Sequence, residues 1–270
     1  MAIKKEYKTV LSIAGSDSGG GAGIQADIKA ASACGCYAMT AITAITAQNT
    51  QGVTDIHAVP AEMIGKQITA VAEDIPIDAV KIGMVPTAEA AVMIARLLER
   101  YSVPNIIIDP VMVATSGDRL IAEDAIDAII EHIFPLAALV TPNIPEAKFI
   151  SGLEVSTEED YPEVAGKFRE KGVKNVLIKS GHLTRDFLTD YLFEGTEVYR
   201  YRYERIHTPN THGTGCTLSS AIASFLALGY PLDEAVGLAE DYIHKAILNG
   251  ADYTLGHGHG PVHHFFRFWE

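Results

Sequence analysis

The chain has 270 residues, of which 48% are hydrophobic and 20% are charged, as in an ordinary folded domain. Its 34 acidic residues outnumber its 21 basic ones, and the formal net charge of −13 argues against a nucleic-acid or anionic-membrane partner, because clustered Lys and Arg bind such partners. Three cysteines do not suggest a disulfide framework, so a reducing, cytoplasmic compartment is expected. The sequence has no signal-peptide core and no apolar run of 18 residues, so neither a leader nor a transmembrane helix is expected.

A glycine-rich loop follows the first predicted strand. Apolar residues 9–14 predict a buried strand, residues 15–23 a loop and residues 24–33 a helix. The loop and helix start fit the dinucleotide pattern G-x-G-x-x-A. However, no Asp or Glu lies between Asp27 and Asp55, where a nicotinamide dehydrogenase needs its ribose-binding acid, so that alternative is weakened. Asp27 itself is either a partner of the helix dipole or a candidate ligand.

The next predicted strand ends in an amide pair. Residues 39–50 form a β-branched run that closes with Gln48 and Asn49. Polar residues at the carboxyl end of a parallel strand face the usual ligand crevice of an open α/β sheet. A primary amide carries both donors and an acceptor, so Gln48 could pair with the ring nitrogen and exocyclic amine of an aminopyrimidine. Alternatively, its side chain merely caps the loop.

Strands and helices then alternate, which predicts an α/β fold with a mostly parallel sheet and helices on both faces. Residues 187–193 and 196–203 flank a Glu-Gly turn and predict an antiparallel hairpin toward one edge. No linker, long repeat or low-complexity tract divides the chain, so we expect a single domain over residues 1–270. The remaining predicted elements are helices near 61–73, 88–100, 123–134 and 232–248, and strands at 79–83, 105–109, 138–141 and 176–181.

Three charged residues, Asp109, Glu146 and Lys179, lie at or just after predicted strand ends. The two carboxylates could hold Mg²⁺ together with waters and substrate phosphates, and the lysine could neutralise phosphate charge. Each also has a plainer interpretation: Asp109 begins an Asp-Pro turn, Glu146 starts a helix and Lys179 is a solvated strand end. A Walker phosphate loop is excluded, because neither Gly-Lys pair of the sequence is followed by Ser or Thr.

The segment 211–216, Thr-His-Gly-Thr-Gly-Cys, runs directly into an apolar helix that ends near Gly229. Gly213 and Gly215 allow backbone N–H groups to converge, and a helix start adds unpaired donors and the positive end of the dipole, so an anion-binding turn is predicted. A helix start also favours the thiolate of a cysteine, so Cys216 could accept a proton near neutral pH. The alternative is an ordinary Gly-x-Gly helix start with a small buried cysteine behind it.

Two segments resemble functional sites in composition, one a zinc site and the other a redox cysteine pair, but the sequence supports neither function. The tail 256–265 is rich in histidine, but its glycines and proline fix no geometry and no thiol or carboxylate set completes a zinc site. We therefore expect a docked or loose C-terminal segment. Cys34-Gly35-Cys36 lacks the usual C-x-x-C spacing of a redox pair, so a helix end with two small apolar side chains is expected.

Six blocks of the sequence point to one family when taken together and in order: Ala14–Asp27, Ala47–Thr50, Lys81–Met84, Asp109–Met112, Thr141–Ala147 and Thr211–Cys216. They closely resemble the bacterial hydroxymethylpyrimidine/phosphomethylpyrimidine kinases of thiamine biosynthesis. The resemblance covers nearly the whole chain, including the closing Gly-x-Gly-Pro-Val-His-His-Phe. It implies a three-layer α/β/α ribokinase-like fold and two ATP-dependent phosphorylations, first of 4-amino-5-hydroxymethyl-2-methylpyrimidine on its hydroxymethyl oxygen and then of the monophosphate.

The resemblance also implies a role for each matching position. The pyrimidine pocket would be lined by Gly15, Ala22, Asp27, Gln48, Met84 and Val111. Mg²⁺ and phosphates would be organised by Asp109 and Glu146, and ATP would be contacted by Lys179 and Thr211. The anion hole would be formed by the N–H groups of Gly213, Thr214, Gly215 and Cys216. Cys216 would be the base, at a position where the wider sugar-kinase superfamily carries an Asp. A homodimer is the family expectation.

Two alternatives remain beside this interpretation. A pyridoxine or pyridoxal kinase of the same subfamily shares the glycine-rich loop and the final cysteine, and Gln48 separates the two because an amide suits an aminopyrimidine edge better than a hydroxypyridine. Some dual activity stays open. A non-catalytic pyrimidine-binding protein would keep Gln48 and Asp27, but it would have no use for Cys216 with its anion hole.

Overall fold

Nine strands form one sheet in the residues that the computed structural model describes, 5–112, 122–181 and 186–269. The strands are β1 (Thr9–Asp17), β2 (Tyr37–Asn49), β3 (Gly52–Ala58), β4 (Ala79–Ile82), β5 (Ile106–Ile108), β6 (Leu139–Val140), β7 (Asn175–Ile178), β8 (Phe187–Glu194) and β9 (Glu197–Glu204). Their order is β3-β2-β1-β4-β5-β6-β7-β8-β9. Pairing is parallel from β2 to β7, whereas β3, β8 and β9 pair antiparallel with their neighbours.

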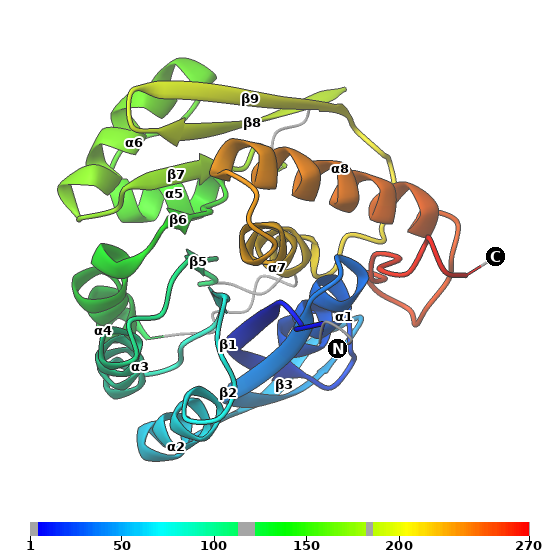
Figure 1. Cartoon of the computed structure of the whole chain (residues 1–270). Helices are drawn as coiled ribbons and strands as arrows, with labels where there is room; N and C mark the ends of the chain where they lie inside the picture. The colour runs from blue at the N-terminus through cyan, green and yellow to red at the C-terminus, as the bar shows by residue number, and fades with distance from the viewer. Residues whose placement is uncertain (1–4, 113–121, 182–185, 270) are drawn as a thin grey trace.

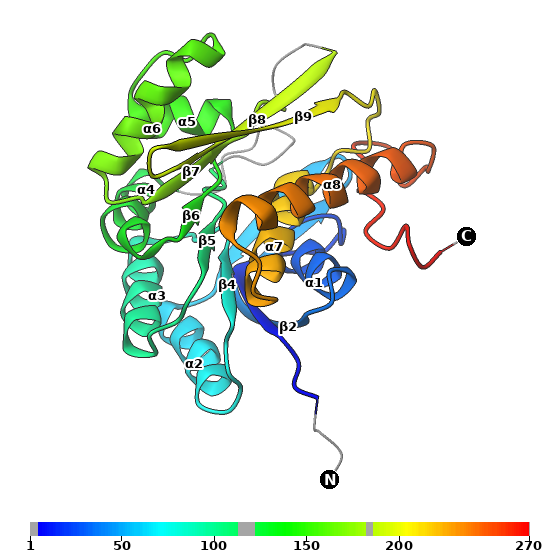
Figure 2. The same ribbon diagram turned by 45° about the horizontal axis from the view of Figure 1, so that its top comes forward.

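Helices cover both faces of this sheet, so the expected three-layer α/β/α arrangement is confirmed. In Figures 1 and 2, α1, α7 and α8 lie on one side of the strands and the helices from α2 to α6 lie on the other. The helical elements are α1 (Gly23–Ala33), α2 (Ala61–Ala72), α3 (Ala88–Arg100), α4 (Glu123–Ala128), η1 (Ile129–Ile133), η2 (Phe134–Leu136), α5 (Ile144–Ser151), η3 (Glu158–Asp160), α6 (Tyr161–Glu170), α7 (Thr214–Ala227) and α8 (Leu232–Gly250).

The short central strands are apolar on both sides because each side faces a separate core. In β5, Ile106 and Ile108 belong to the core beneath α2 to α6, whereas Ile107 belongs to the core beneath α1, α7 and α8. Successive side chains of a strand point to opposite faces, so a continuous apolar run is what a sheet buried on both faces requires. In β1, Leu11 and Val10 divide between the two cores in the same way.

Most predicted elements are confirmed, but helix α6 was not predicted, and three further differences appear. The first strand does not end at Ala14 but continues to Asp17, because its parallel pairing with β2 resumes after a register shift between Ala14 and Ser16. The edge strand β3 was not predicted, since its largely exposed residues carry little apolar pattern. The predicted helix over 123–134 is α4 followed by the π-helical turn η1. The single-domain boundary stays a prediction.

The strand order fixes where a site can form. The chain moves outward from β1 to β2 and then returns to place β4 on the other side of β1. Helix α1, which follows β1, covers one face of the sheet, and α3, which follows β4, covers the other (Figure 2). The carboxyl ends of β1 and β4 therefore border the crevice in which open α/β sheets bind ligands.

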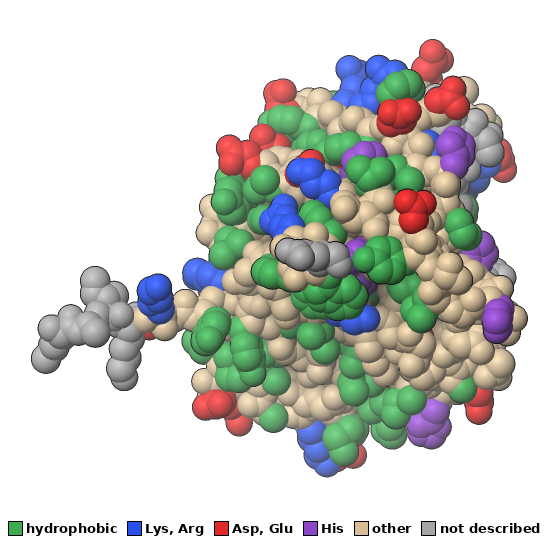
Figure 3. Space-filling model, turned by 90° about the vertical axis from the view of Figure 1, so that its right-hand side faces the viewer, with side chains coloured by type: hydrophobic (Ala, Val, Ile, Leu, Met, Phe, Trp, Pro, Cys, Tyr) green, Lys and Arg blue, Asp and Glu red, His purple; other side chains and the backbone are tan. Residues whose placement is uncertain are grey.

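The C-terminal residues pack against the described body of the protein instead of hanging loose. Val262 and His264 are buried, while Phe268 and Trp269 are 67% and 62% exposed. Figure 3 views this side and shows hydrophobic side chains gathered near the centre of the face. Among the described residues, no helix combines the length and the apolar character needed to cross a membrane.

Cys34 and Cys36 are buried free thiols at the end of α1 and just before β2, as expected. Burial raises the pKa of Cys34 to about 12 and that of Cys36 to about 11. Both thiols therefore stay protonated near neutral pH and behave as small apolar side chains.

The core contribution of one aromatic residue gives a stability prediction. Phe168 of α6 is fully buried and stacks on Phe134 with ring centroids 6.0 Å apart, whereas Phe149 of α5 is 53% exposed. We expect Phe168→Ala to lower the unfolding free energy by about 3–5 kcal/mol, because it leaves a cavity, and Phe149→Ala to change it by less than about 1 kcal/mol. Urea denaturation of both variants measures this difference, and equal effects would contradict the burial described above.

Candidate active site

The start of α7 is built for close contact with the glycine-rich loop. Gly213 has a φ of +80°, and a Cβ atom there would lie 1.8 Å from the carbonyl oxygen of Gly21, so only glycine fits. No side chain caps the helix, and its first backbone bond runs from Thr217 N–H to Gly213 O at 2.9 Å. Within the described residues, no acceptor is recorded for the N–H groups of Gly215 and Cys216. These donors are therefore free to meet an anion.

Asp17 holds the two glycine-containing loops together. Its carboxylate accepts hydrogen bonds from the N–H groups of Gly19, Gly21 and Ala22 at 2.7–3.0 Å, and it lies 2.8 Å from Nε2 of His212. Burial alone would raise the pKa of Asp17, but the bonds from His212 and the loop amides hold it below its ordinary value. Asp17 and His212 lie inside the two matching blocks, yet neither was predicted as a site residue.

Cys216 lies in the first turn of α7 and is partly exposed. Burial raises the pKa of its thiol to about 11, with smaller contributions from the carboxylates of Asp27 and Asp109. The ammonium of Lys81 and a hydrogen bond from the Gly23 N–H act in the opposite direction but do not outweigh burial. The prediction that the helix start favours the thiolate is therefore wrong, because desolvation of the charged form dominates over the helix dipole here.

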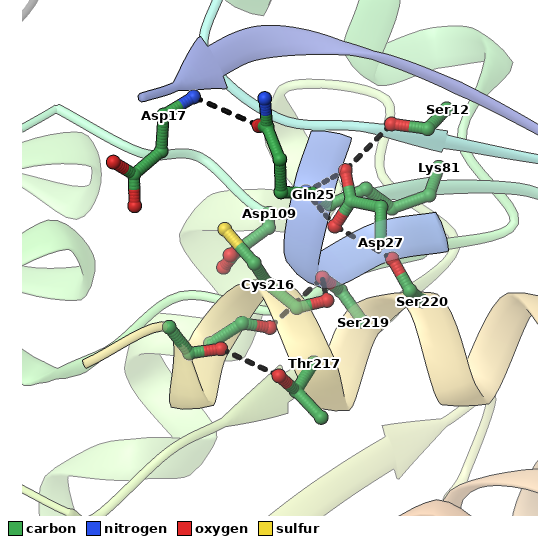
Figure 4. Close-up of polar contacts among 12 residues, drawn as sticks. Ser12, Asp17, Gln25, Asp27, Lys81, Asp109, Cys216, Thr217, Ser219 and Ser220 are labelled. Carbon is green, nitrogen blue, oxygen red and sulfur yellow. Dashed lines mark hydrogen bonds and ion pairs between the residues drawn. The ribbon is translucent and has the colours of Figure 1, made fainter. Parts of the chain in front are cut away.

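The predicted contact between Asp27 and a pyrimidine does not fit its surroundings. Asp27 is 1% exposed, and both of its carboxylate oxygens are already paired. Ser12 donates at 2.6 Å, Ser220 at 2.8 Å, and Lys81 forms an ion pair at 2.9 and 3.0 Å (Figure 4). Asp27 therefore holds other parts of the protein in place instead of facing a ligand.

The other residues predicted to line the pyrimidine pocket lie near the ends of β1, β2, β4 and β5, except for Ala22, which immediately precedes α1. Gly15 packs against Met84, since a Cβ at position 15 would lie 3.3 Å from the Met84 sulfur. Gln48 is half-buried; its Oε1 accepts from Thr46 at 3.0 Å, and its backbone pairs with the Ser18 hydroxyl at 2.7 and 2.8 Å. The structure records no partner for the Gln48 Nε2 group among its described residues. Ala22 and Val111 are half-buried as well.

A second charged cluster borders the start of α7. Asp109 is buried and accepts from Lys179 Nζ at 2.7 Å and from Thr141 at 3.3 Å. A Cβ at Gly215 would lie 3.1 Å from Asp109 Oδ2 and 3.4 Å from Lys179 Nζ, so this ion pair contacts the predicted anion-binding turn. Thr211 begins the turn, and its carbonyl accepts from the Thr214 N–H at 3.4 Å.

Glu146 lies beside this ion pair and also caps α5. It exchanges hydrogen bonds with Asn143 in a capping box, at 2.8 and 3.0 Å, so the plainer interpretation of Glu146 as a helix-start residue is confirmed. Burial raises its pKa to about 7; Asp109 adds to the increase and Lys179 opposes it. Two neighbouring buried carboxylates, Asp109 and Glu146, thus have the ammonium of Lys179 between them to balance their negative charge.

This donor set fits Mg²⁺ in part. No group of three or more His, Cys, Asp or Glu side chains suited to a metal occurs in the portion of the chain that the structure describes. Mg²⁺, however, is commonly held by one or two carboxylates while waters and substrate phosphates complete its shell. Asp109 and Glu146 supply such a pair next to the unpaired amides of α7, and a cation there would relieve the unfavourable ionisation of Glu146.

The C-terminal strap, residues 256–264, also supports the start of α7. The His212 N–H donates to Gly260 O at 3.0 Å, and Nε2 of His264 lies 2.9 Å from the Thr217 hydroxyl. Burial lowers the pKa of His264 to about 3, so its imidazole is neutral. Of the two expectations for this segment, the docked one is confirmed; the supporting role of His264 was not predicted, because periodicity gives no sign of it.

Comparison with known proteins places this geometry in a family. A family model described as phosphomethylpyrimidine kinase matches residues 17–263. A hydroxymethylpyrimidine/phosphomethylpyrimidine kinase of Rhizobium meliloti is 50% identical over 261 residues, which are 96% of this chain and 98% of that one. A thiamine biosynthesis bifunctional protein of Geobacter sulfurreducens is also 50% identical, but the chain spans only about half of it, 52%.

Solved structures agree in fold. The crystal structure of a phosphomethylpyrimidine kinase from Clostridium difficile has a TM-score of 0.79 at 46% identity and covers 88% of this chain and 99% of its own. An ADP complex of a Bacillus subtilis pyridoxal kinase has a TM-score of 0.88 at 35% identity and covers 96% and 98%. The expected ribokinase-like fold is thereby confirmed.

The raised pKa of Glu146 predicts a pH dependence of stability. Because its folded-state pKa of about 7 lies above the ordinary 4.5, the carboxyl stabilises the fold below pH 4.5 and this contribution is lost as the pH rises through 7. Without added divalent cation, the stability of Glu146→Gln relative to the unmodified chain should rise by about 1–3 kcal/mol between pH 4.5 and pH 8. Urea unfolding at several pH values measures this, and exposed Glu159→Gln is the control. Parallel curves for Glu146→Gln and the unmodified chain would contradict it.

Proposed function

Because the chain belongs to the phosphomethylpyrimidine kinase family, we propose that it phosphorylates 4-amino-5-hydroxymethyl-2-methylpyrimidine with ATP and then converts the monophosphate to the diphosphate, in thiamine biosynthesis. The observation that carries this proposal is the uncapped start of α7. Its N–H groups at Gly215 and Cys216 have no recorded acceptor in the described residues, and Gly215 lies next to the Asp109–Lys179 ion pair, so a phosphoryl group could bind donors from both.

In the first phosphorylation the attacking group is the hydroxymethyl oxygen of the pyrimidine, and in the second it is an oxygen of the monophosphate. The bond of the attacking oxygen to the γ-phosphorus forms while the bond from that phosphorus to the bridging oxygen breaks, and ADP leaves with the electron pair. The N–H groups at the start of α7 and the Lys179 ammonium stabilise the negative charge on the phosphoryl group during transfer. These donors are fixed before the reaction, since Asp17 and the C-terminal strap hold the turn that carries them.

Cys216 would take the proton of the alcohol. A thiol with a pKa near 11 is rarely ionised at neutral pH, and only its thiolate form can accept a proton, so turnover proceeds through the minor fraction in which Cys216 is ionised. A loose phosphoryl-transfer transition state does not require a strong base. The alcohol becomes strongly acidic only once its oxygen has begun to bond to phosphorus. Cys216 therefore acts chiefly by position, and the proton moves late.

The remaining site residues have supporting roles in the proposal. Asp109 and Glu146 would hold Mg²⁺, which when bound neutralises part of the nucleotide's phosphate charge. Thr211 and Lys179 would contact ATP. The amide of Gln48, with an Nε2 group for which no partner is recorded in the described residues, would read the aminopyrimidine edge beside Gly15, Ala22, Met84 and Val111. We further propose a cytoplasmic homodimer.

Pyridoxal phosphorylation is the second candidate, and one observation favours it. The pyridoxal kinase of Bacillus subtilis has the higher TM-score, 0.88 against 0.79, although its identity to this chain is lower. Both substrates present a hydroxymethyl group on a heteroaromatic ring, so the same phosphoryl-transfer machinery could serve either one.

A parallel measurement of ADP release tests the proposed function. We expect turnover with the pyrimidine alcohol and with its monophosphate, and a kcat/KM for pyridoxal that is lower by about 10²-fold or more, because the half-buried Gln48 amide left without its partner disfavours the wrong ring. A faster reaction with pyridoxal would replace the proposal by the second candidate. Absence of ADP release with all three compounds would remove the kinase assignment.

The role of Cys216 gives a separate prediction. We expect Cys216→Ser to lower kcat by about 10²-fold or more with little change in substrate KM, because a serine hydroxyl keeps the size but loses the proton acceptor. Cys36→Ser, a buried cysteine in the core beneath α1 and α7, is the matched control and should keep kcat. Steady-state kinetics at saturating ATP measure both, and an unchanged kcat in Cys216→Ser would exclude that thiol from the mechanism.

A further inference from the structure

Lys81 and Asp27 form an ion pair that is closed off from solvent. Their side chains are 0% and 1% exposed, and Lys81 Nζ lies 2.9 and 3.0 Å from the two carboxylate oxygens of Asp27. Ser12 and Ser220 each donate one further hydrogen bond to that carboxylate. Four elements therefore meet at this pair: β1 through Ser12, α1 through Asp27, β4 through Lys81 and α7 through Ser220.

The backbone leaves room for the ammonium group. A Cβ atom at Gly83 would lie 2.9 Å from Lys81 Nζ and 3.1 Å from the Ala14 side chain, so a side chain at position 83 would displace the ammonium. The Lys-Ile-Gly sequence at the end of β4 thus has a physical reason: the lysine needs a glycine two residues later. The ammonium lies at the end of β4, beside the crevice between β1 and β4.

The ion pair lies on the same side of α7 as Cys216. Ser220, which binds Asp27 at 2.8 Å, comes four residues after Cys216, and residues four apart share one face of a helix. Figure 4 shows both side chains directed from α7 toward α1. The charged groups that act on the Cys216 sulfur are Lys81 from β4, Asp27 from α1 and Asp109 after β5, and the Gly23 N–H of α1 adds a hydrogen bond.

Stability alone does not explain a buried ion pair at this place. Taking two charges out of water is unfavourable, and replacing such a pair by apolar side chains of similar volume is often neutral or stabilising. A positive charge in the same place has a direct electrostatic use, because it favours negative charge on a neighbouring sulfur in a medium of low dielectric constant.

We propose that Lys81 is a positioning residue of the reaction: Asp27 and Gly83 hold its ammonium on the Cys216 side of α7, where it favours the thiolate form of Cys216, the only form that can accept a proton. The role in turnover rests on the proposed function of Cys216, whereas the electrostatic effect on the thiol does not. Asp27, predicted to bind substrate, is then the group that orients Lys81.

Alkylation of Cys216 by iodoacetamide tests the electrostatic effect without any substrate. Removing the cation in Lys81→Met should slow the reaction at pH 8 about tenfold, because the thiolate is the reacting form. Removing the carboxylate in Asp27→Asn should speed it about threefold or more, since Lys81 then acts unopposed. A purely structural role would loosen the site in both variants and shift both rates in the same direction.

Mass spectrometry of the Cys216 peptide measures the alkylation rate of this cysteine alone. Alkylation of the buried Cys34 and Cys36 in the same sample would indicate general unfolding. Lys81→Met leaves a buried carboxylate unpaired and could fail to fold. The comparison of Asp27→Asn with the double variant Asp27→Asn/Lys81→Met avoids this difficulty, because both lack that carboxylate and differ only in the cation. The double variant should react about tenfold more slowly than Asp27→Asn.

Turnover provides the second readout. The double variant should lose kcat about tenfold or more relative to the unmodified chain, while the KM for the pyrimidine stays within about twofold, since neither residue faces substrate. Equal alkylation rates in Asp27→Asn and the double variant, or a loss confined to KM, would overturn the proposal. If the unmodified chain releases no ADP while the alkylation rates differ as expected, the proposed function fails and the electrostatic role of Lys81 stands.

Discussion

The approach of Gly213 to the carbonyl oxygen of Gly21 is the constraint on which the site depends. It brings the starts of α1 and α7 together, although 190 residues separate them in the chain, and it leaves no room for a side chain. Neither helix has a side-chain cap at its start, so both offer backbone donors to the same region. Asp17 and His212 fix the distance between the loops. The anion-binding character of the site is therefore a property of backbone placement more than of any one side chain.

Buried charge is arranged around this backbone site in two separate sets. Lys81 and Asp27 lie on the α1 side, and Lys179 with Asp109 and Glu146 lies at the ends of the following strands. The first set is fully paired, whereas the second carries more carboxylates than cations. An electrically balanced set suits a fixed supporting role, and an unbalanced set suits a ligand that brings its own cation.

The sequence allowed the fold and much of the site to be predicted for physical reasons. Parallel strands share one carboxyl edge, so Asp109 and Lys179 could be expected near each other from strand ends alone. The burial of Asp27 could not be expected, because its partners Lys81 and Ser220 are 54 and 193 residues away. The sign of the pKa shift at Cys216 depends on the balance between a helix start and desolvation, which no local pattern reports.

The C-terminal strap makes the order of synthesis matter for this site. The turn at residues 211–216 leaves the ribosome well before Gly260 and His264, which accept the His212 N–H and pair with the Thr217 hydroxyl. Until those residues emerge, the sheet and helix α1 can assemble while the start of α7 lacks two of its supports. A nascent chain could therefore bury most of its core without yet having a rigid anion-binding turn, and the turn would become rigid only once residues 260–264 have been made.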